Sequence, residues 1–245
     1  MLVVCYHAVS REWPAELAVS ADQLEDEVRF LLGRGFDPVT FTEAVTGSEP
    51  AKVMAVTFDD AYRSIYERAR PILERLGVPG TVFVPTAFPD SRAPMRWAGI
   101  DAFAHGPWAA ELVPASWDEL RALSRSGWEI GSHTRSHPHL PRLADAELSR
   151  ELEESRRDCE RGIRAPCTAI AYPYGDTDER VARAAAAAGY SAGAALYVPL
   201  KRNSTQSDPM RWPRLVFNRR DGRLRARAKV RLFTASPGVW NLFHG

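Results

Sequence analysis

The stretch Val53-Met54-Ala55-Val56-Thr57-Phe58-Asp59-Asp60 decides how this chain of 245 residues is interpreted. Its first six residues are apolar or β-branched and predict a buried strand. Two adjacent carboxylates, Asp59 and Asp60, follow where that strand ends. Burying them is costly unless cations or hydrogen-bond donors pair with them. The sequence therefore predicts a charged site at the end of a strand.

A set of partners for these carboxylates lies further along, in Ser132-His133-Thr134-Arg135-Ser136-His137. Two histidines and one carboxylate hold a divalent cation with positions left open, and a second carboxylate is then free to act as a base. Gly131 before and Pro138 after this stretch favour a loop or a single turn over a helix. The alternatives are surface histidines and an aspartate that caps the next helix.

Strand and helix patterns alternate through the chain, which is typical of parallel strands joined by helices in a barrel or a doubly wound sheet. We expect strands at 2–6, 53–58, 81–84, 128–131, 168–172, 191–197 and 215–217, and helices at 20–33, 62–76, 117–126, 143–163 and 178–188. The candidate residues follow the ends of different strands, as the residues of one barrel rim do. Residues 86–116 predict a long loop over the site. No repeat or linker interrupts the chain, so we expect one domain, 1–245.

The composition restricts the possible partners. The net charge of +1 gives no indication of nucleic-acid binding. Residues 211–231, in a basic C-terminal segment 211–245, carry nine basic side chains and one acid, Asp221. They would suit an anionic partner, such as the phosphate of a lipid-linked glycan or a membrane surface, or form a solvated face. The start of the chain lacks the features of a signal peptide, so we expect a cytoplasmic protein. The three cysteines predict buried thiols.

With Tyr172-Pro173-Tyr174-Gly175 added to the aspartate and histidine motifs, the chain resembles the polysaccharide deacetylases of carbohydrate esterase family 4. The resemblance covers residues 1–220. It implies a distorted (β/α) barrel of about seven strands. It also implies Asp60, His133 and His137 as ligands of zinc or a similar divalent ion, and Asp59 as the base that activates water. A backbone N–H near Tyr174 would help to form the oxyanion hole.

The sequence departs from the family pattern at two places. The arginine two residues before the proline of the third motif is replaced by Ala171, and we expect Arg214 to supply this cation from another strand. The late Leu-x-His motif has no convincing copy, since His244 lies too near the end. Instead, Val4-Cys5-Tyr6-His7 resembles the start of a circularly permuted branch that includes poly-β-1,6-N-acetylglucosamine deacetylases. By this resemblance His7 is the general acid, and its alternative role is a packed histidine of the first strand.

The resemblance implies metal-dependent removal of an N-acetyl group from an N-acetylated sugar in a polysaccharide, oligosaccharide or glycan precursor. One alternative is a carbohydrate-binding protein that has lost the chemistry. Another is a non-haem iron oxygenase, because two histidines and one aspartate also form that triad. Such triads usually lie in all-β barrels, which the alternation of strands and helices opposes. Among the aromatic residues near the expected site, we predict that only Tyr174 lines it, and we expect His139 to lie outside the ligand set.

Overall fold

The computed structural model describes residues 1–47, 52–196 and 208–235. The predicted end of a strand at Tyr197 and the C-terminal residues 236–245, with His244, lie outside these ranges. Within them, no helix combines the length and the apolar character that a membrane span requires. All three cysteines are free and buried, as the sequence predicted.

The strands form one parallel sheet that closes on itself. Its order is β10 (Trp212–Pro213), β9 (Ala192–Ala195), β8 (Ala169–Ala171), β7 (Glu129–Ser132), β6 (Gly80–Val84), β5 (Val53–Phe58), β1 (Leu2–Tyr6) and β11 (Leu215–Val216). The first and last strands of this order, β10 and β11, are separated along the chain by Arg214 alone. The extended segment 212–216 therefore joins the two ends of the sheet and makes it a barrel.

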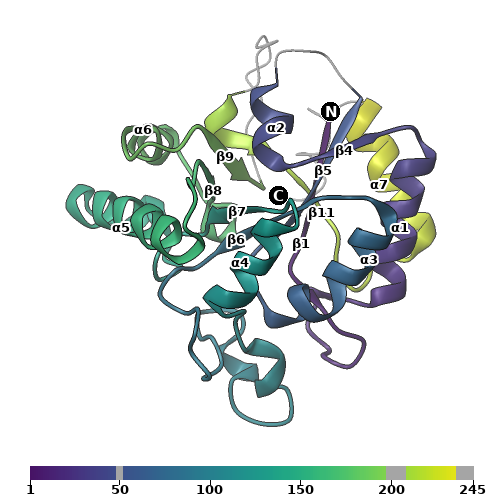
Figure 1. Ribbon diagram of the computed structural model, residues 1–245, viewed down its shortest axis with the longest axis horizontal. Coiled ribbons are helices and arrows are strands. Elements are labelled where there is room, and N and C mark those ends of the chain that lie inside the picture. The colour runs from purple at the N-terminus through teal and green to yellow at the C-terminus, as the bar shows by residue number, and fades with distance from the viewer. Residues whose placement is uncertain (48–51, 197–207, 236–245) are drawn as a thin grey trace.

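Helices lie around the outside of these strands (Figure 1). They are α1 (Ala21–Gly33), α2 (Phe41–Thr46), α3 (Arg70–Leu76), α4 (Trp117–Arg125), α5 (Asp145–Ile163), α6 (Glu179–Ala187) and α7 (Arg223–Ala235). Strands covered by helices on one face and by the barrel interior on the other are apolar throughout. All five residues of β1 are accordingly buried. The predicted distorted (β/α) barrel is confirmed, and eight strands lie on its path where about seven were expected.

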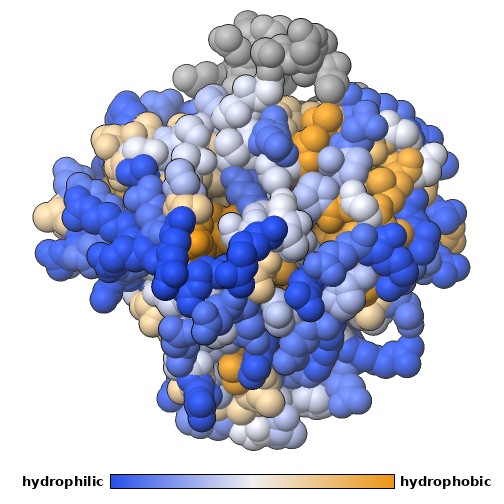
Figure 2. Space-filling view, in the orientation of Figure 1, coloured by the Kyte–Doolittle hydropathy of each residue, from blue (hydrophilic) through white to orange (hydrophobic). Residues whose placement is uncertain are grey.

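Smaller elements complete the fold. β4 (Asp37–Val39) pairs with β5 outside the barrel path, and β2 (Ala8–Val9) pairs with β3 (Ala18–Val19) in a separate sheet. A π-helix, Ile65–Ala69, precedes α3. The 3₁₀ turns are Asp101–Phe103, Ala109–Leu112, Leu140–Arg142, Pro173–Gly175 and Pro209–Arg211. On the face shown in Figure 2 most described residues are hydrophilic, and hydrophobic ones appear only in short strips.

Three details differ from the sequence expectations. The helix expected from Tyr62 begins later and passes through a π-helical turn, because Pro71 has no N–H to donate into a regular α-helical turn. Helix α7 was not expected, since arginines interrupt its apolar stripe, yet Ala226, Val230 and Phe233 are buried. Nor did the sequence indicate the turn at Asp60, whose φ of 68° lies in the left-handed region.

Candidate active site

Side chains that follow several strands meet in one pocket. His7 follows β1, Asp59 and Asp60 follow β5, and His133 follows β7. Because the strands are parallel, their carboxyl ends lie at the same rim of the barrel. A cavity of about 690 Å³ opens there, and its lining includes all seven residues that the sequence analysis selected: His7, Asp59, Asp60, His133, His137, Tyr174 and Arg214.

Asp60 and the two histidines converge on one point. Oδ1 of Asp60 lies 3.4 Å from Nε2 of His133 and 3.4 Å from Nε2 of His137. This buried oxygen makes no hydrogen bond among the described residues. One carboxylate oxygen and two imidazole nitrogens, held close without bonding each other, are a donor set that fits a divalent metal ion. The three residues therefore form a candidate metal site.

The charges of this site agree with that assignment. Burial alone would raise the pKa of Asp60, but its interactions with His133 and His137 outweigh burial and hold the pKa well below its usual range. Burial lowers the pKa of His137 despite the nearby carboxylate. Asp60 ionised and His137 neutral are the forms in which each residue ligates a metal. At His133 burial is outweighed by Asp59 and Asp60, which raise its pKa, so metal binding there competes with a proton.

His133 is oriented by the barrel itself. Its Nδ1 lies 2.8 Å from the carbonyl oxygen of Ala171, at the end of the neighbouring strand β8. A carbonyl oxygen only accepts hydrogen bonds, so Nδ1 carries the proton and Nε2 is left to bind an ion. Such a bond to the second ring nitrogen is the usual way in which proteins fix a metal-binding histidine.

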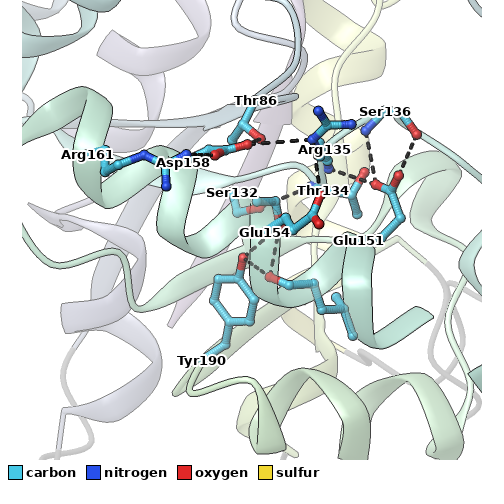
Figure 3. A network of polar contacts seen from close by, with 12 residues as sticks. Thr86, Ser132, Thr134, Arg135, Ser136, Glu151, Glu154, Asp158, Arg161 and Tyr190 are labelled. Carbon is cyan, nitrogen blue, oxygen red and sulfur yellow. Dashed lines mark hydrogen bonds and ion pairs between the residues drawn. The ribbon is translucent and has the colours of Figure 1, made fainter. Parts of the chain in front are cut away.

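A polar network holds the turn between the two histidines against α5 (Figure 3). Glu151 accepts hydrogen bonds from the backbone N–H groups of Arg135 and Ser136, at 2.9 and 3.0 Å, and from the Ser136 hydroxyl at 2.6 Å. The Arg135 side chain pairs with Glu154 at 3.4 Å. The backbone N–H of His137 donates to Oγ1 of Thr134 at 3.1 Å. These contacts define a loop, as the flanking glycine and proline predicted.

Asp59 faces a different partner. The Arg214 guanidinium donates to both of its carboxylate oxygens, each at 2.7 Å, and also to Oγ1 of Thr57 at 3.1 Å. Asp59 and Arg214 are almost fully buried. Burial would raise the pKa of Asp59, but Arg214 and His133 outweigh it and lower the pKa to about 2. Arg214, in the segment that closes the barrel, thus places a cation at this carboxylate.

His7 and Cys5 lie beside Asp59. Cys5 Sγ is 3.6 Å from Oδ2 of Asp59, and donor atoms of Cys5, His7 and Asp59 all lie within 4.8 Å of one another. Burial raises the pKa of the Cys5 thiol, which therefore keeps its proton. Sequence reasoning did not select Cys5. Its place immediately before the Tyr6-His7 pair, on a strand adjacent to β5, is the signal that could have found it.

Tyr174 lies in a turn with unusual backbone geometry. Its φ is 61°, and Gly175 follows with a φ of 67°. A Cβ atom on Gly175 would lie 2.4 Å from Cβ of Leu196, so glycine is required there. The Tyr174 ring stacks on His139, with ring centroids 3.9 Å apart. His139 thus lies behind the pocket, outside the metal ligands.

Two further aromatic residues line the pocket, so the prediction that only Tyr174 among the aromatic residues lines it is wrong. They are Trp97 and Phe103, from the long loop between β6 and α4. Trp117 packs instead beside Gly162, and the Tyr172 hydroxyl donates to the Met210 carbonyl at 2.7 Å. The loop position predicted that this segment lies over the site, but not which of its side chains face the cavity.

Most basic residues of 211–231 are paired within the chain. Their partners are Asp208 for Arg211, Asp59 for Arg214, backbone carbonyls for Arg219, Glu16 for Arg220, Asp26 for Arg223, the Phe30 ring for Arg227, and Asp221 for both Arg225 and Lys229. Of these basic residues, only Arg214, Arg225 and Lys229 line the cavity.

Known proteins resemble the chain in sequence and in fold. The family model for polysaccharide deacetylase matches residues 46–193. YxkH of Bacillus subtilis is 24% identical over 196 residues, which cover 78% of this chain and 62% of YxkH. The poly-β-1,6-N-acetyl-D-glucosamine N-deacetylase of Staphylococcus aureus is 26% identical over 171 residues, covering 64% of this chain and 54% of that enzyme. The matched part is thus less than two thirds of either relative.

The fold has a solved counterpart in the deacetylase PplD of Streptococcus pyogenes. The TM-score is 0.74 at 20% sequence identity, with 94% of this chain and 97% of PplD covered. This similarity establishes the barrel, and the family model extends over more than half of the chain and includes the aspartate pair and both histidines. The resemblance seen in the motifs is thereby confirmed: the chain belongs to the polysaccharide deacetylase family.

Proposed function

We propose that this chain hydrolyses the N-acetyl group of an N-acetylated sugar, in a polysaccharide, oligosaccharide or glycan precursor, and releases acetate. One observation carries the proposal. Asp60, His133 and His137 converge on a single point, while the adjacent Asp59 is paired with Arg214. This arrangement provides a metal site and a separate ionised base in one pocket.

We propose zinc as the ion that Asp60, His133 and His137 hold. When bound, such an ion lowers the pKa of water and polarises the acetyl carbonyl. The donor set of two imidazoles and one carboxylate leaves further coordination positions for water and substrate.

Asp59 is the proposed base, which takes a proton from the attacking water. The two hydrogen bonds from Arg214 keep its carboxylate ionised and fix its direction at the end of β5. The pairing lowers the basicity of Asp59 but ensures that the group is deprotonated and in place at neutral pH.

His7 and Tyr174 take the remaining roles. His7 lines the pocket from the end of β1, next to β5, and is proposed to protonate the leaving amine nitrogen. The backbone N–H of Tyr174 is proposed to stabilise the oxyanion that develops on the acetyl oxygen. Water attacks the carbonyl carbon, the C–N bond breaks, and acetate and a free amine leave without an acyl-enzyme.

We further propose that Arg225 and Lys229 are the part of 211–231 that contacts an anionic group of the glycan. These two cations line the pocket and share one carboxylate, Asp221. Arg225→Gln should raise KM for a phosphate-bearing N-acetylated sugar about tenfold and leave KM for a neutral one unchanged. Arg231→Gln, an exposed change on the same helix, is the matched control. An unchanged KM for the phosphate-bearing sugar in Arg225→Gln would remove this partner from the proposal.

The test of the main proposal is acetate release from a β-1,6-linked N-acetylglucosamine oligosaccharide, the substrate class named for the Staphylococcus aureus relative. The zinc-loaded chain should release acetate and free amine in equal amounts. Chelator-treated protein, Asp59→Asn and His7→Gln should release little. Acetate release in the absence of oxygen would exclude the alternative of a non-haem iron oxygenase. The parallel barrel also disfavours that alternative. Sugar binding without acetate release from any N-acetylated oligosaccharide tried would instead support the inactive carbohydrate-binding protein.

A further inference from the structure

The two histidines of the candidate metal site are held in different ways. His133 donates from Nδ1 to the carbonyl oxygen of Ala171. The Nδ1 atom of His137 is also buried, but it has no hydrogen-bond partner in the described part of the chain. Metal-binding histidines almost always donate this second N–H to a fixed acceptor, which sets the ring orientation. The orientation of His137 therefore needs another explanation.

Aromatic rings enclose His137 on two sides. The Trp97 indole is stacked on the imidazole, with centroids 4.2 Å apart and an interplanar angle of 19°. The Tyr174 ring meets it edge-on at 4.7 Å and 70°. Tyr174 is itself stacked on His139, whose Nδ1 lies 3.3 Å from an Asp176 oxygen. The rings of Trp97, His137, Tyr174 and His139 thus contact one another in this order, and one of them belongs to a candidate metal ligand.

Trp97 is fixed well enough to orient its neighbour. Its carbonyl oxygen accepts hydrogen bonds from the N–H groups of Ile100 and Asp101, at 3.2 and 3.1 Å. The indole also meets the Phe88 ring at an interplanar angle of 70°, with ring centroids 5.4 Å apart. The indole therefore has a defined position in the loop between β6 and α4.

We propose that Trp97 is a positioning residue for the metal ligand His137, and that its stacking replaces the hydrogen bond that orients His133. The inference rests on the proposed metal site, and it extends that site to a loop outside the aspartate and histidine motifs. A consequence is that metal affinity depends on the packing of the loop that also forms one wall of the substrate pocket.

The test is a titration of the metal-free full chain with Co²⁺, followed by the visible absorption bands that report the coordination geometry. Trp97→Leu keeps apolar bulk but removes the ring, and should weaken Co²⁺ binding about tenfold and shift the bands. Trp97→Phe keeps a ring and should restore binding to within about threefold of the unchanged chain. Trp108→Ala, in the same loop but away from the pocket, should bind as the unchanged chain does.

The outcomes separate this inference from the proposed function. If the unchanged chain binds no Co²⁺, the metal site and the inference fail together. If the unchanged chain binds Co²⁺ and Trp97→Leu binds it with the same affinity and the same spectrum, only the inference fails. Thermal unfolding of each metal-free variant shows whether the fold is intact. The inference is supported if folded Trp97→Leu loses Co²⁺ affinity and Trp97→Phe restores it. This result would show that His137 needs a stacked ring and not only an apolar neighbour.

Discussion

Two clusters of polar side chains inside the fold differ in how completely their members are paired. The pocket cluster consists of Asp59, Asp60, His133, His137 and Arg214. The α1–α7 cluster consists of Tyr6, Gln23, Glu27, Asp221 and Lys229, between helices α1 and α7. In the second cluster Glu27 accepts from the Tyr6 hydroxyl at 2.9 Å and from the Gln23 amide at 3.1 Å, and Lys229 donates to Asp221.

The difference lies in the polar atoms without hydrogen bonds. In the pocket cluster Oδ1 of Asp60, Nδ1 of His137 and Nε of Arg214 are buried and have no hydrogen-bond partner among the described residues. In the α1–α7 cluster only Oδ1 of Asp221 has none, and it lies 3.1 Å from Nε of Arg225. A buried polar atom without a partner costs free energy. A fold that maintains several of them around a cavity is prepared for a ligand, whereas the closed network of the α1–α7 cluster, from which only Lys229 reaches the pocket, chiefly stabilises the fold.

Asp60→Asn should give the largest effect and tests the pocket cluster directly. An amide is a poor metal ligand, so we expect metal binding to be lost and deacetylase activity to fall by about 10⁴-fold or more. The depressed pKa of Asp60 means that its ionised form favours folding, so the metal-free variant should also be somewhat less stable than the unchanged metal-free chain at neutral pH. Metal content and thermal unfolding of the metal-free proteins measure both effects. Retained metal binding in the folded variant would show that Asp60 is not a ligand.

Asp59→Asn should reduce activity by about 10²–10⁴-fold while metal binding persists, since Asp59 is the base and not a ligand. It also leaves the Arg214 guanidinium buried without a counter-charge, which costs about 3–5 kcal/mol of stability. The double variant Asp59→Asn with Arg214→Met should recover much of that stability and none of the activity. Urea unfolding and metal content distinguish the two roles. Loss of metal in folded Asp59→Asn would make this carboxylate a ligand.

Arg214→Lys should have a smaller effect, a fall in kcat of about 10–100-fold with little change in KM. Lysine keeps a positive charge but cannot donate to both oxygens of Asp59 in a fixed plane, so the carboxylate loses orientation rather than ionisation. Steady-state kinetics at saturating metal measure this. Unchanged kcat would mean that Arg214 only closes the barrel and takes no part in positioning the base.

The pocket cluster was more predictable from the sequence than the α1–α7 cluster. Asp59, Asp60, His133 and His137 stand in short motifs, and the parallel strands that carry them bring their side chains to one rim. Arg214 could be proposed because a cation was missing at Ala171. Its position beside Asp59 could not be predicted from a motif, because it depends on how segment 212–216 joins the two ends of the sheet.

The remaining contacts depend on side-chain packing, which no motif records. Trp97 and Trp108 lie in the same loop and have the same side chain, yet only Trp97 lines the pocket. The left-handed backbone at Asp60 was equally unpredictable, because it depends on the tertiary contacts of the turn. Glu27 occupies an apolar position of α1 and showed no sign that Tyr6 and Gln23 would surround it.

Glu27→Gln should give the smallest effect, and it tests the α1–α7 cluster by its pH dependence. Burial raises the pKa of Glu27 to about 8, against the hydrogen bonds from Gln23 and Tyr6. The folded chain therefore keeps a proton that the unfolded chain releases above its ordinary pKa of 4.5. Stability then falls as the pH rises between these two values and levels off above about 8.

Glutamine does not titrate, so the stability of Glu27→Gln relative to the unchanged chain should increase from pH 5 to pH 8, by on the order of 2 kcal/mol. Urea unfolding at several pH values measures this difference. Glu25→Gln, a change on the same helix at a half-buried carboxylate paired with Arg29 and Arg75, should show little, because the pKa of Glu25 is lowered and the group is mostly ionised in both states over this range. Activity at pH 7 should be unchanged in Glu27→Gln if the closed network serves the fold alone. Reduced activity without loss of stability would instead connect the two clusters through Tyr6, the residue next to His7.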